Sequence, residues 1–263
     1  PSAVISPKAQ IDPTANIGPG AVIDGEVTVG AGCEVGPHVY LTGWTRIGAN
    51  NRFHAGCVIG DAPQDLKYKN ERTGVIIGDD NVFREGVTVH RSAKVDEATV
   101  IGSHNYLMVN AHIGHNGAVG NHVIIANGAL LAGHVEVGDR AFISGNCLIH
   151  QFTRIGTLAM MQGGAGVGRD LPPFTIAYGV NNIIGLNVVG LRRAGIKPEE
   201  RLELKRLYQA LFRSGRNLTE AAAAAQAQFN GAASRTMLDF VGSTKRGICL
   251  HRARRGQSHD DID

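Results

Sequence analysis

The chain of 263 residues carries a formal net charge of +3, is only 5% aromatic and contains 35 glycines. So small a charge does not favour nucleic acid, and we expect no nucleic-acid partner. The sequence does not open with a charged and then apolar leader and holds no run of about 18 apolar residues, so we expect a cytoplasmic protein without membrane insertion. The four cysteines follow neither a disulfide nor a zinc spacing, in keeping with a reducing compartment.

One six-residue phase runs from Ile11 to Gly168. Except at positions 65 and 71, every sixth residue is apolar, the next residue is often glycine, and the residue two before it is often small, as at Cys33, Cys57 and Cys147. Neither the helical period of 3.6 nor the strand period of 2 produces this pattern, which is the signature of a hexapeptide β-helix. The apolar residue should fill the core of each coil, the small residue should pack beside it, and glycine or another permissive residue should turn the corner. The sequence therefore predicts an all-β solenoid.

Two stretches leave this phase. Residues 61–74 put Asp65 and Glu71 where apolar residues should stand, and the phase returns at Ile77, so we expect an excursion loop from a continuous solenoid. Residues 92–98 form a second, shorter break. Loops on a rigid scaffold often carry function, and residues 64–68 of the longer loop bring a carboxylate, an ammonium and a phenol together. A solvated charged loop is the alternative at this point.

Beyond Gly168 the pattern changes. Pro172 and Pro173 exclude a continuing ladder, so we assign residues 1–186 to the solenoid and 187–250 to a small α-helical domain. Residues 190–195 are expected to form a connector. Helices are expected over about 197–214, 217–229 and 233–241, the first of them with a proline and acidic residues in its first turn. The charged, apolar-poor residues 251–263 predict a disordered tail.

Six histidines in the second half of the repeat occupy outward slots: His104, His112, His115, His122, His134 and His150. A single surface histidine is usually without function. If three hexads close one coil, however, residues eighteen apart lie above one another, and His115, Gly133 with His134, and His150 with Gln151 fall on neighbouring rungs of one column. Three imidazoles could hold zinc. One imidazole could instead act as a general base, with a backbone N–H such as that of Gly133 holding an oxyanion.

Six short strings occur in a fixed order along the chain: "QDLKY" (64–68), "VTVHR" (87–91), "NAHIGH" (110–115), "ALLAGHV" (129–135), "HQF" (150–152) and "GLRR" (190–193). Together they resemble the UDP-N-acetylglucosamine O-acyltransferase family of lipid A biosynthesis. The resemblance extends over the whole chain to about Gly247, including the C-terminal helices.

The resemblance implies a left-handed parallel β-helix that forms a homotrimer, with active sites between neighbouring subunits. It implies transfer of a (3R)-hydroxyacyl chain from acyl carrier protein to the 3-hydroxyl of UDP-N-acetylglucosamine, the first step of lipid A biosynthesis. No metal and no dissociable cofactor would be needed, because 4'-phosphopantetheine arrives on the acyl carrier protein.

The resemblance also implies roles for single residues. His115 matches the general base that takes the proton of the sugar hydroxyl, and Gly133 matches the residue whose N–H holds the oxyanion. Gly163 matches a position that helps to set acyl chain length. The remaining matches are contacts to substrate: Asp65, Lys67, His90, His112, His134, His150 and Gln151 around the acyl and sugar groups, and Asn187 and Arg193 at the nucleotide end.

The sequence departs from the family pattern at three positions. Asn116 stands where an aspartate usually follows the base, Ala194 replaces a second arginine, and Val189 replaces an acidic residue. The reaction type is therefore better supported than the sugar nucleotide, and the same chemistry on a related amino-sugar nucleotide is an alternative. A zinc hydrase of the carbonic anhydrase type would want two histidines about five apart, whereas His112 and His115 are three apart. A non-enzymatic β-helix scaffold is a further alternative.

Overall fold

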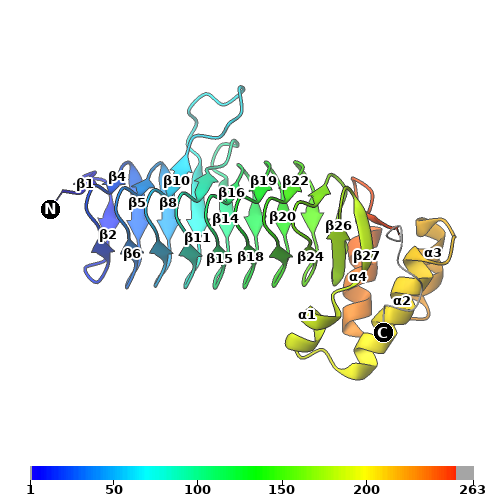
Figure 1. Cartoon of the computed structure of the whole chain (residues 1–263). Coiled ribbons are helices and arrows are strands. Elements are labelled where there is room, and N and C mark those ends of the chain that lie inside the picture. Colours follow the sequence, from blue (N-terminus) through cyan, green and yellow to red (C-terminus); the bar gives the residue numbers. More distant parts are fainter. Residues whose placement is uncertain (1, 253–263) are drawn as a thin grey trace.

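The structure, a computed structural model that describes residues 2–252, winds the chain into a three-sided coil with helices at its C-terminal end (Figure 1). Successive strands join different sheets, and along most of the coil each strand pairs in parallel with the strand three positions later. Sheet A contains β1 (Val4–Ile5), β4 (Val22–Ile23), β7 (Tyr40–Leu41), β10 (Val58–Asp61), β13 (Thr88–His90), β16 (His112–Ile113), β19 (Leu130–Leu131), β22 (Leu148–Ile149) and β25 (Gly166–Val167).

The other two sides of the coil are built in the same way. Sheet B contains β2 (Gln10–Ile11), β5 (Glu26–Val29), β8 (Trp44–Ile47), β11 (Gly74–Ile77), β14 (Ala98–Ile101), β17 (Ala118–Val119), β20 (Glu136–Val137) and β23 (Arg154–Ile155). Sheet C contains β3 (Asn16–Ile17), β6 (Glu34–Val35), β9 (Arg52–Phe53), β12 (Val82–Phe83), β15 (Tyr106–Leu107), β18 (Ile124–Ile125), β21 (Phe142–Ile143), β24 (Met160–Met161), β26 (Thr175–Tyr178), β27 (Asn182–Leu186) and β28 (Leu250–His251). The structure thus contains the parallel solenoid that the six-residue phase predicts.

The core runs along the axis of the coil. Three phased apolar residues of sheet A, Ile113, Leu131 and Ile149, are at most 3% exposed and stack from rung to rung. Cys33, Cys57 and Cys147 are fully buried beside them, as the sequence predicts. The period is therefore set by burial of one large side chain per strand.

The corners differ from the expectation for glycine. The turns are made about three residues after the apolar position, at residues with positive φ such as Asn50 (57°) and His134 (60°). The glycine that directly follows the apolar residue serves a different purpose. A Cβ on Gly114 would lie 2.8 Å from the backbone of the next rung. Most of these glycines are thus required by close approach between rungs, and polar residues as well as glycine turn the chain.

The two breaks in the phase are loops that leave the coil next to each other (Figure 1). The longer one connects β10 to β11 and the shorter one connects β13 to β14. Because β11 pairs with both β8 and β14, the coil continues across both excursions. The longer loop runs from Asp61, the last residue of β10, to Gly74, the first residue of β11.

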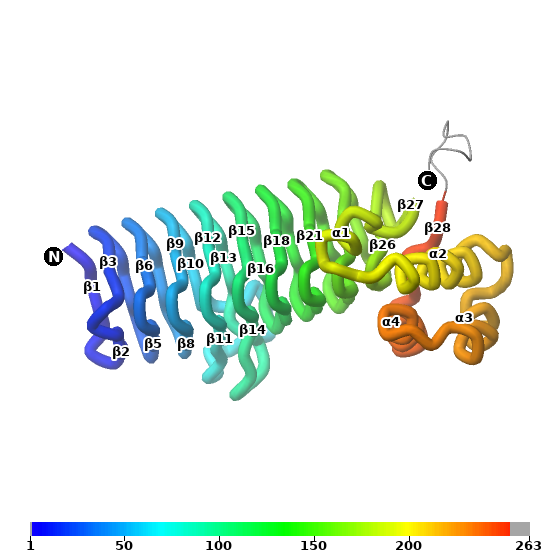
Figure 2. Tube along the Cα trace, turned by 90° about the horizontal axis from the view of Figure 1, so that it is seen from below, coloured from blue at the N-terminus to red at the C-terminus, as the bar shows by residue number. Residues whose placement is uncertain are grey.

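Within residues 2–252, four helices follow the coil and lie near its C-terminal end (Figure 2): α1 (Val188–Arg193), α2 (Pro198–Phe212), α3 (Leu218–Gln226) and α4 (Ala232–Gly242). The last three agree with the predicted helices. The expectation of a connector over 190–195 is wrong, because Asn187 caps α1 by accepting a hydrogen bond from the Gly190 N–H, and Leu191 is buried.

The C-terminal end of the coil departs from parallel pairing. β27 runs antiparallel to β26, and β28 adds to β27. His251 belongs to β28 and the Arg252 N–H donates to Ile183 O, so the expectation of disorder is wrong at residues 251 and 252. The rest of that expectation falls on 253–263, which lie outside the described residues.

A buried ion pair joins the coil to α4. The Asp170 carboxylate, 1% exposed, accepts from Arg154 Nη2 at 2.8 Å and from the Thr244 hydroxyl at 2.8 Å. Arg154 Nη2 also donates to Phe240 O at 3.1 Å. These bonds neutralise a carboxylate that burial would otherwise destabilise, so the helices have a defined position at the end of the coil.

Candidate active site

A group of imidazoles lies where the chain leaves sheet A for sheet B. His90 packs edge-on against His112, with ring centroids 4.8 Å apart, and His115 packs edge-on against His134 at 5.2 Å. The His134 ring in turn stacks on Phe152 at 4.6 Å. Ring contacts thus join four histidines, which the sequence predicts to face outward or to contact substrate, into two pairs. His115 acts electrostatically on His90, His112 and His134, so the two pairs form one cluster.

His115 is held in one tautomer by Asn116. The Asn116 Oδ1 accepts from the Ala93 N–H at 3.0 Å, so the carboxamide oxygen is oriented towards that side. The same oxygen lies 2.9 Å from His115 Nδ1, which must therefore donate. The other ring nitrogen, Nε2, is left without a proton in the neutral imidazole and is able to accept one.

Gly133 lies directly under the free nitrogen of His115. A Cβ at Gly133 would be 2.6 Å from His115 Nε2 and Cε1, so the imidazole occupies the space that a side chain would fill. Within the described residues, the Gly133 N–H has no hydrogen-bond acceptor. A proton acceptor and an available backbone donor therefore lie side by side.

The neighbouring imidazoles are held neutral. Burial, together with the positive charges that His90 and His115 would carry, lowers the pKa of His112 to about 4. Burial also lowers the pKa of His90 and of His134, and His115 contributes to both shifts. The Thr88 hydroxyl contacts His112 Nδ1 at 2.7 Å, which orients that ring. These three imidazoles are suited to hydrogen bonding rather than to carrying charge at neutral pH.

The loop between β10 and β11 brings Asp65 towards this cluster. Its carboxylate lies close enough to His134 to act on that imidazole electrostatically, and it caps the loop by accepting from the Lys67 N–H at 2.9 Å. Arg91 holds the loop to the coil, because its Nε donates to the Tyr68 hydroxyl at 3.0 Å and its Nη1 to Gly60 O at 2.9 Å. The Lys67 side chain is exposed.

The other predicted residues lie at increasing distance along the coil. His150 and Gln151 are exposed one rung beyond Gly133, and His150 Nδ1 contacts Arg246 Nη2 at 3.3 Å. Gly163 lies in the turn from β24 to β25, which is the opposite edge of sheet A. A Cβ there would meet nothing closer than Gly145 O at 3.6 Å.

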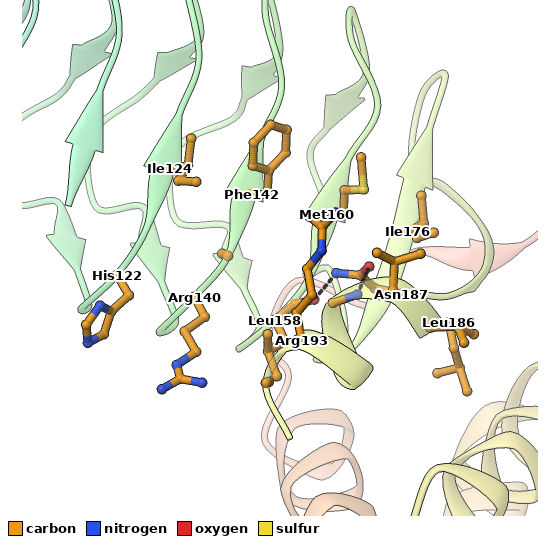
Figure 3. Close-up of a pocket in the computed structure, with 15 residues that line it drawn as sticks. His122, Ile124, Arg140, Phe142, Leu158, Met160, Ile176, Leu186, Asn187 and Arg193 are labelled. Atoms are coloured by element: carbon orange, nitrogen blue, oxygen red, sulfur yellow. Dashed lines mark hydrogen bonds between the residues drawn. The ribbon is translucent and has the colours of Figure 1, made fainter. Parts of the chain in front are cut away.

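Asn187 and Arg193 line a separate cavity of about 580 Å³ against sheet C (Figure 3). The apolar side chains of Ile124, Phe142 and Met160 line the sheet side of this cavity. Asn187 is 8% exposed, and its carboxamide accepts from the Gly190 N–H and donates to Leu158 O, both at 2.9 Å. In the single chain Asn187 is therefore a helix cap, and the structure does not bring it or Arg193 to the histidine cluster.

Sequence reasoning missed several side chains of the cluster. Thr88, Phe152 and Arg91 lie within recognised strings, but nothing in those strings distinguishes a residue that orients a ring or a loop. Ser92 and Glu97 both bond to Asn116. The break at 92–98 was the only signal that could have pointed to them.

Within the part of the chain that the structure describes, no group of three histidine, cysteine, aspartate or glutamate side chains is placed to hold a metal ion. Among residues 2–252 no helix has the length and hydropathy needed to cross a bilayer.

Residues 170–249 match the family model for domain 2 of UDP N-acetylglucosamine O-acyltransferase, and residues 26–61 match the bacterial transferase hexapeptide model. The chain is 41% identical to the acyl-[acyl-carrier-protein]–UDP-N-acetylglucosamine O-acyltransferase of Syntrophobacter fumaroxidans, over 94% of this chain and 98% of that protein. It is 46% identical to the corresponding protein of Thermodesulfovibrio yellowstonii, over 94% and 97%. The solved UDP-N-acetylglucosamine acyltransferase of Francisella novicida superimposes with a TM-score of 0.90 at 36% identity, covering 95% of this chain and 93% of that one. The chain belongs to the family of acyl-[acyl-carrier-protein]–UDP-N-acetylglucosamine O-acyltransferases.

Proposed function

We propose that the protein transfers a (3R)-hydroxyacyl chain from acyl carrier protein to the 3-hydroxyl of UDP-N-acetylglucosamine, the first step of lipid A biosynthesis. The observation that carries this proposal is the pairing of His115 Nε2 with the Gly133 N–H, one an acceptor for a proton and the other a donor to an oxyanion. The family of the chain agrees with this chemistry.

In the proposed reaction His115 Nε2 takes the proton of the sugar 3-hydroxyl as the oxygen attacks the thioester carbonyl. The carbonyl oxygen gains negative charge and is stabilised by the Gly133 N–H. When the tetrahedral intermediate collapses, the carbon–sulfur bond breaks and the thiolate of phosphopantetheine takes the proton from His115. The protein needs no cofactor of its own, because the phosphopantetheine belongs to the donor.

The outer surface of sheet A supports the placement of the acyl chain. Its outward residues change from polar to apolar along paired strands, from Thr88 and His112 to Leu130, Leu148 and Gly166. Leu130 is 44% exposed and Leu148 is 56% exposed, although both are large and apolar. An acyl chain that starts at His115 and runs across these leucines would remove them from water.

Gly163→Met tests where this acyl chain ends. Its Cβ has room in the fold, because the nearest atom is 3.6 Å away, so the side chain would project over the far edge of sheet A. We expect preference to shift towards shorter acyl donors, because each methylene removed from burial costs about 0.8 kcal/mol. The measurement is kcat/KM over a series of acyl chain lengths, with Gly185→Ala as a control. An unchanged preference places the end of the chain elsewhere.

A homotrimer is part of the proposal. His112 lies on sheet A, and His115 lies at the corner that follows this strand. Asn187 and Arg193 line a cavity against sheet C instead. Within one chain, the acyl end of the predicted site is therefore separated from its nucleotide end. A second copy that sets its sheet C beside sheet A of the first would close the site on two sides, and ligand sites are concave. Light scattering should give three chain masses. A fully active monomer would contradict this arrangement.

The activity itself is tested with acyl-loaded acyl carrier protein and UDP-N-acetylglucosamine. Mass spectrometry should find a sugar nucleotide that carries one ester-linked hydroxyacyl chain, with release of the free carrier thiol. Faster acylation of a related amino-sugar nucleotide would favour the alternative acceptor, which the departures at Val189 and Ala194 leave open. The left-handed winding and the cytoplasmic location belong to the same proposal; an experimental density map tests the first and cell fractionation tests the second.

A further inference from the structure

The loop between β13 and β14 is built around the side chain of Asn116. The Asn116 Nδ2 donates to Ser92 Oγ at 2.6 Å and to Glu97 Oε2 at 3.3 Å. Its Oδ1 accepts from the Ala93 N–H, and its own N–H donates to Thr99 Oγ1 at 2.9 Å. Both polar atoms of the Asn116 carboxamide therefore form hydrogen bonds, and one acceptor of its Nδ2 is the Glu97 carboxylate.

A continuous chain of hydrogen bonds thus links Glu97 to the imidazole. It runs from Glu97 Oε2 to Asn116 Nδ2, and from Asn116 Oδ1 to His115 Nδ1. The carboxamide is neutral, so it cannot by itself stabilise an imidazolium by charge. We infer that Glu97 is a positioning residue that supplies the negative charge of the site through Asn116, and this inference rests on the proposed role of His115 as the base.

The charges around His115 limit the size of this effect. Lys94 Nζ lies 3.3 Å from Glu97 Oε1 and partly offsets the carboxylate, and the Glu97 side chain is 51% exposed. Asp65 acts on the same cluster from the other loop, while His90, His112 and His134 add positive charge when they are protonated. An exposed carboxylate in this setting should have a measurable but modest influence.

Glu97→Gln removes the charge and keeps an oxygen that can accept from Asn116. Because a nearby negative charge favours the protonated imidazole, its loss should move the acidic limb of kcat/KM to lower pH, by roughly 0.2–0.7 units. Asp96→Asn is the matched control. It removes the same charge one residue away, from a side chain that points to Arg72 at 3.5 Å, and should leave the limb in place.

Asn116→Asp gives a second test, because Glu97→Gln should have the opposite effect in that background. An aspartate would put a carboxylate oxygen where the amide now donates, 3.3 Å from Glu97 Oε2, and the two carboxylates would repel. Glu97→Gln restores a donor at that point. We therefore expect Glu97→Gln to raise kcat/KM in the Asn116→Asp protein, although it weakens the base in the natural sequence. This gain tests whether residues 97 and 116 are in direct contact, while the shift of the acidic limb in Glu97→Gln alone tests whether Glu97 supplies charge to the base.

A histidine-selective NMR titration supplies a readout that does not depend on turnover. The His115 titration midpoint should move down in Glu97→Gln and stay in place in Asp96→Asn. Equal profiles for these two variants, by kinetics or by NMR, would overturn the inference while leaving the proposed function intact. A His115→Ala enzyme with normal turnover would instead defeat the proposed function itself.

Discussion

His115→Ala should lower kcat by about 10²–10⁴-fold, the range that a general base contributes. The imidazole is directed out of the coil, where it contacts the side chains of Asn116 and His134 and fills the space above Gly133. No apolar core residue depends on it, so the melting temperature should change little. Single-turnover acyl transfer with saturating substrates measures the chemical step directly.

The matched control for this substitution is His54→Ala. His54 is also an outward histidine of the coil, but it lies beside Glu85, at 3.8 Å, in the turn after β9 and away from the cluster. It should retain near-normal kcat. Similar losses in the two variants would mean that removing any outward imidazole disturbs the coil, and the role of base would no longer follow from the His115 result.

The sequence predicts the repetitive parts of this molecule well because each rung obeys the same local rule. Ile113, Leu131 and Ile149 are inward for one reason, burial of an apolar side chain at a fixed period, and one sequence is enough to see it. The residues that form the corners are harder to predict from the sequence. Gly114 looks like a turn residue in the sequence, but the next rung excludes its side chain, and that constraint becomes visible only when two rungs are stacked.

In the site, too, contacts within the repeat are predictable from the sequence and contacts made by loops are not. The eighteen-residue spacing correctly brings His115 above Gly133, because both belong to the repeat. The contacts of Asn116 with Ser92 and Glu97 could not be predicted, since they depend on the path of a loop outside the repeat. Asn187 illustrates a different difficulty, because a residue matched to substrate contact is used in the single chain to cap α1.

Gly133→Ala should reduce kcat strongly without removing either proposed catalytic group. The backbone N–H remains, and so does the imidazole. The new methyl group would stand 2.6 Å from His115 Nε2 and Cε1, so the ring must move. A shift of about 1 Å at a reacting group can cost about 10²-fold, and we expect a loss of that order.

The control for this substitution is Gly185→Ala in β27, where a Cβ would meet nothing within 4 Å, and it should leave kcat unchanged. Gly133→Ala should also melt near the temperature of the parent protein, because the nearest atoms to the new methyl group belong to a side chain at the surface of the coil.

In a His115→Ala background, Gly133→Ala should lower kcat much less than it does alone, because the methyl group then has no imidazole to displace and groups that act together are not additive. If Gly133→Ala lowered kcat equally in both backgrounds, the glycine would be needed only to position its own backbone N–H. If Gly133→Ala alone kept full activity, His115 would reach the sugar hydroxyl from another rotamer.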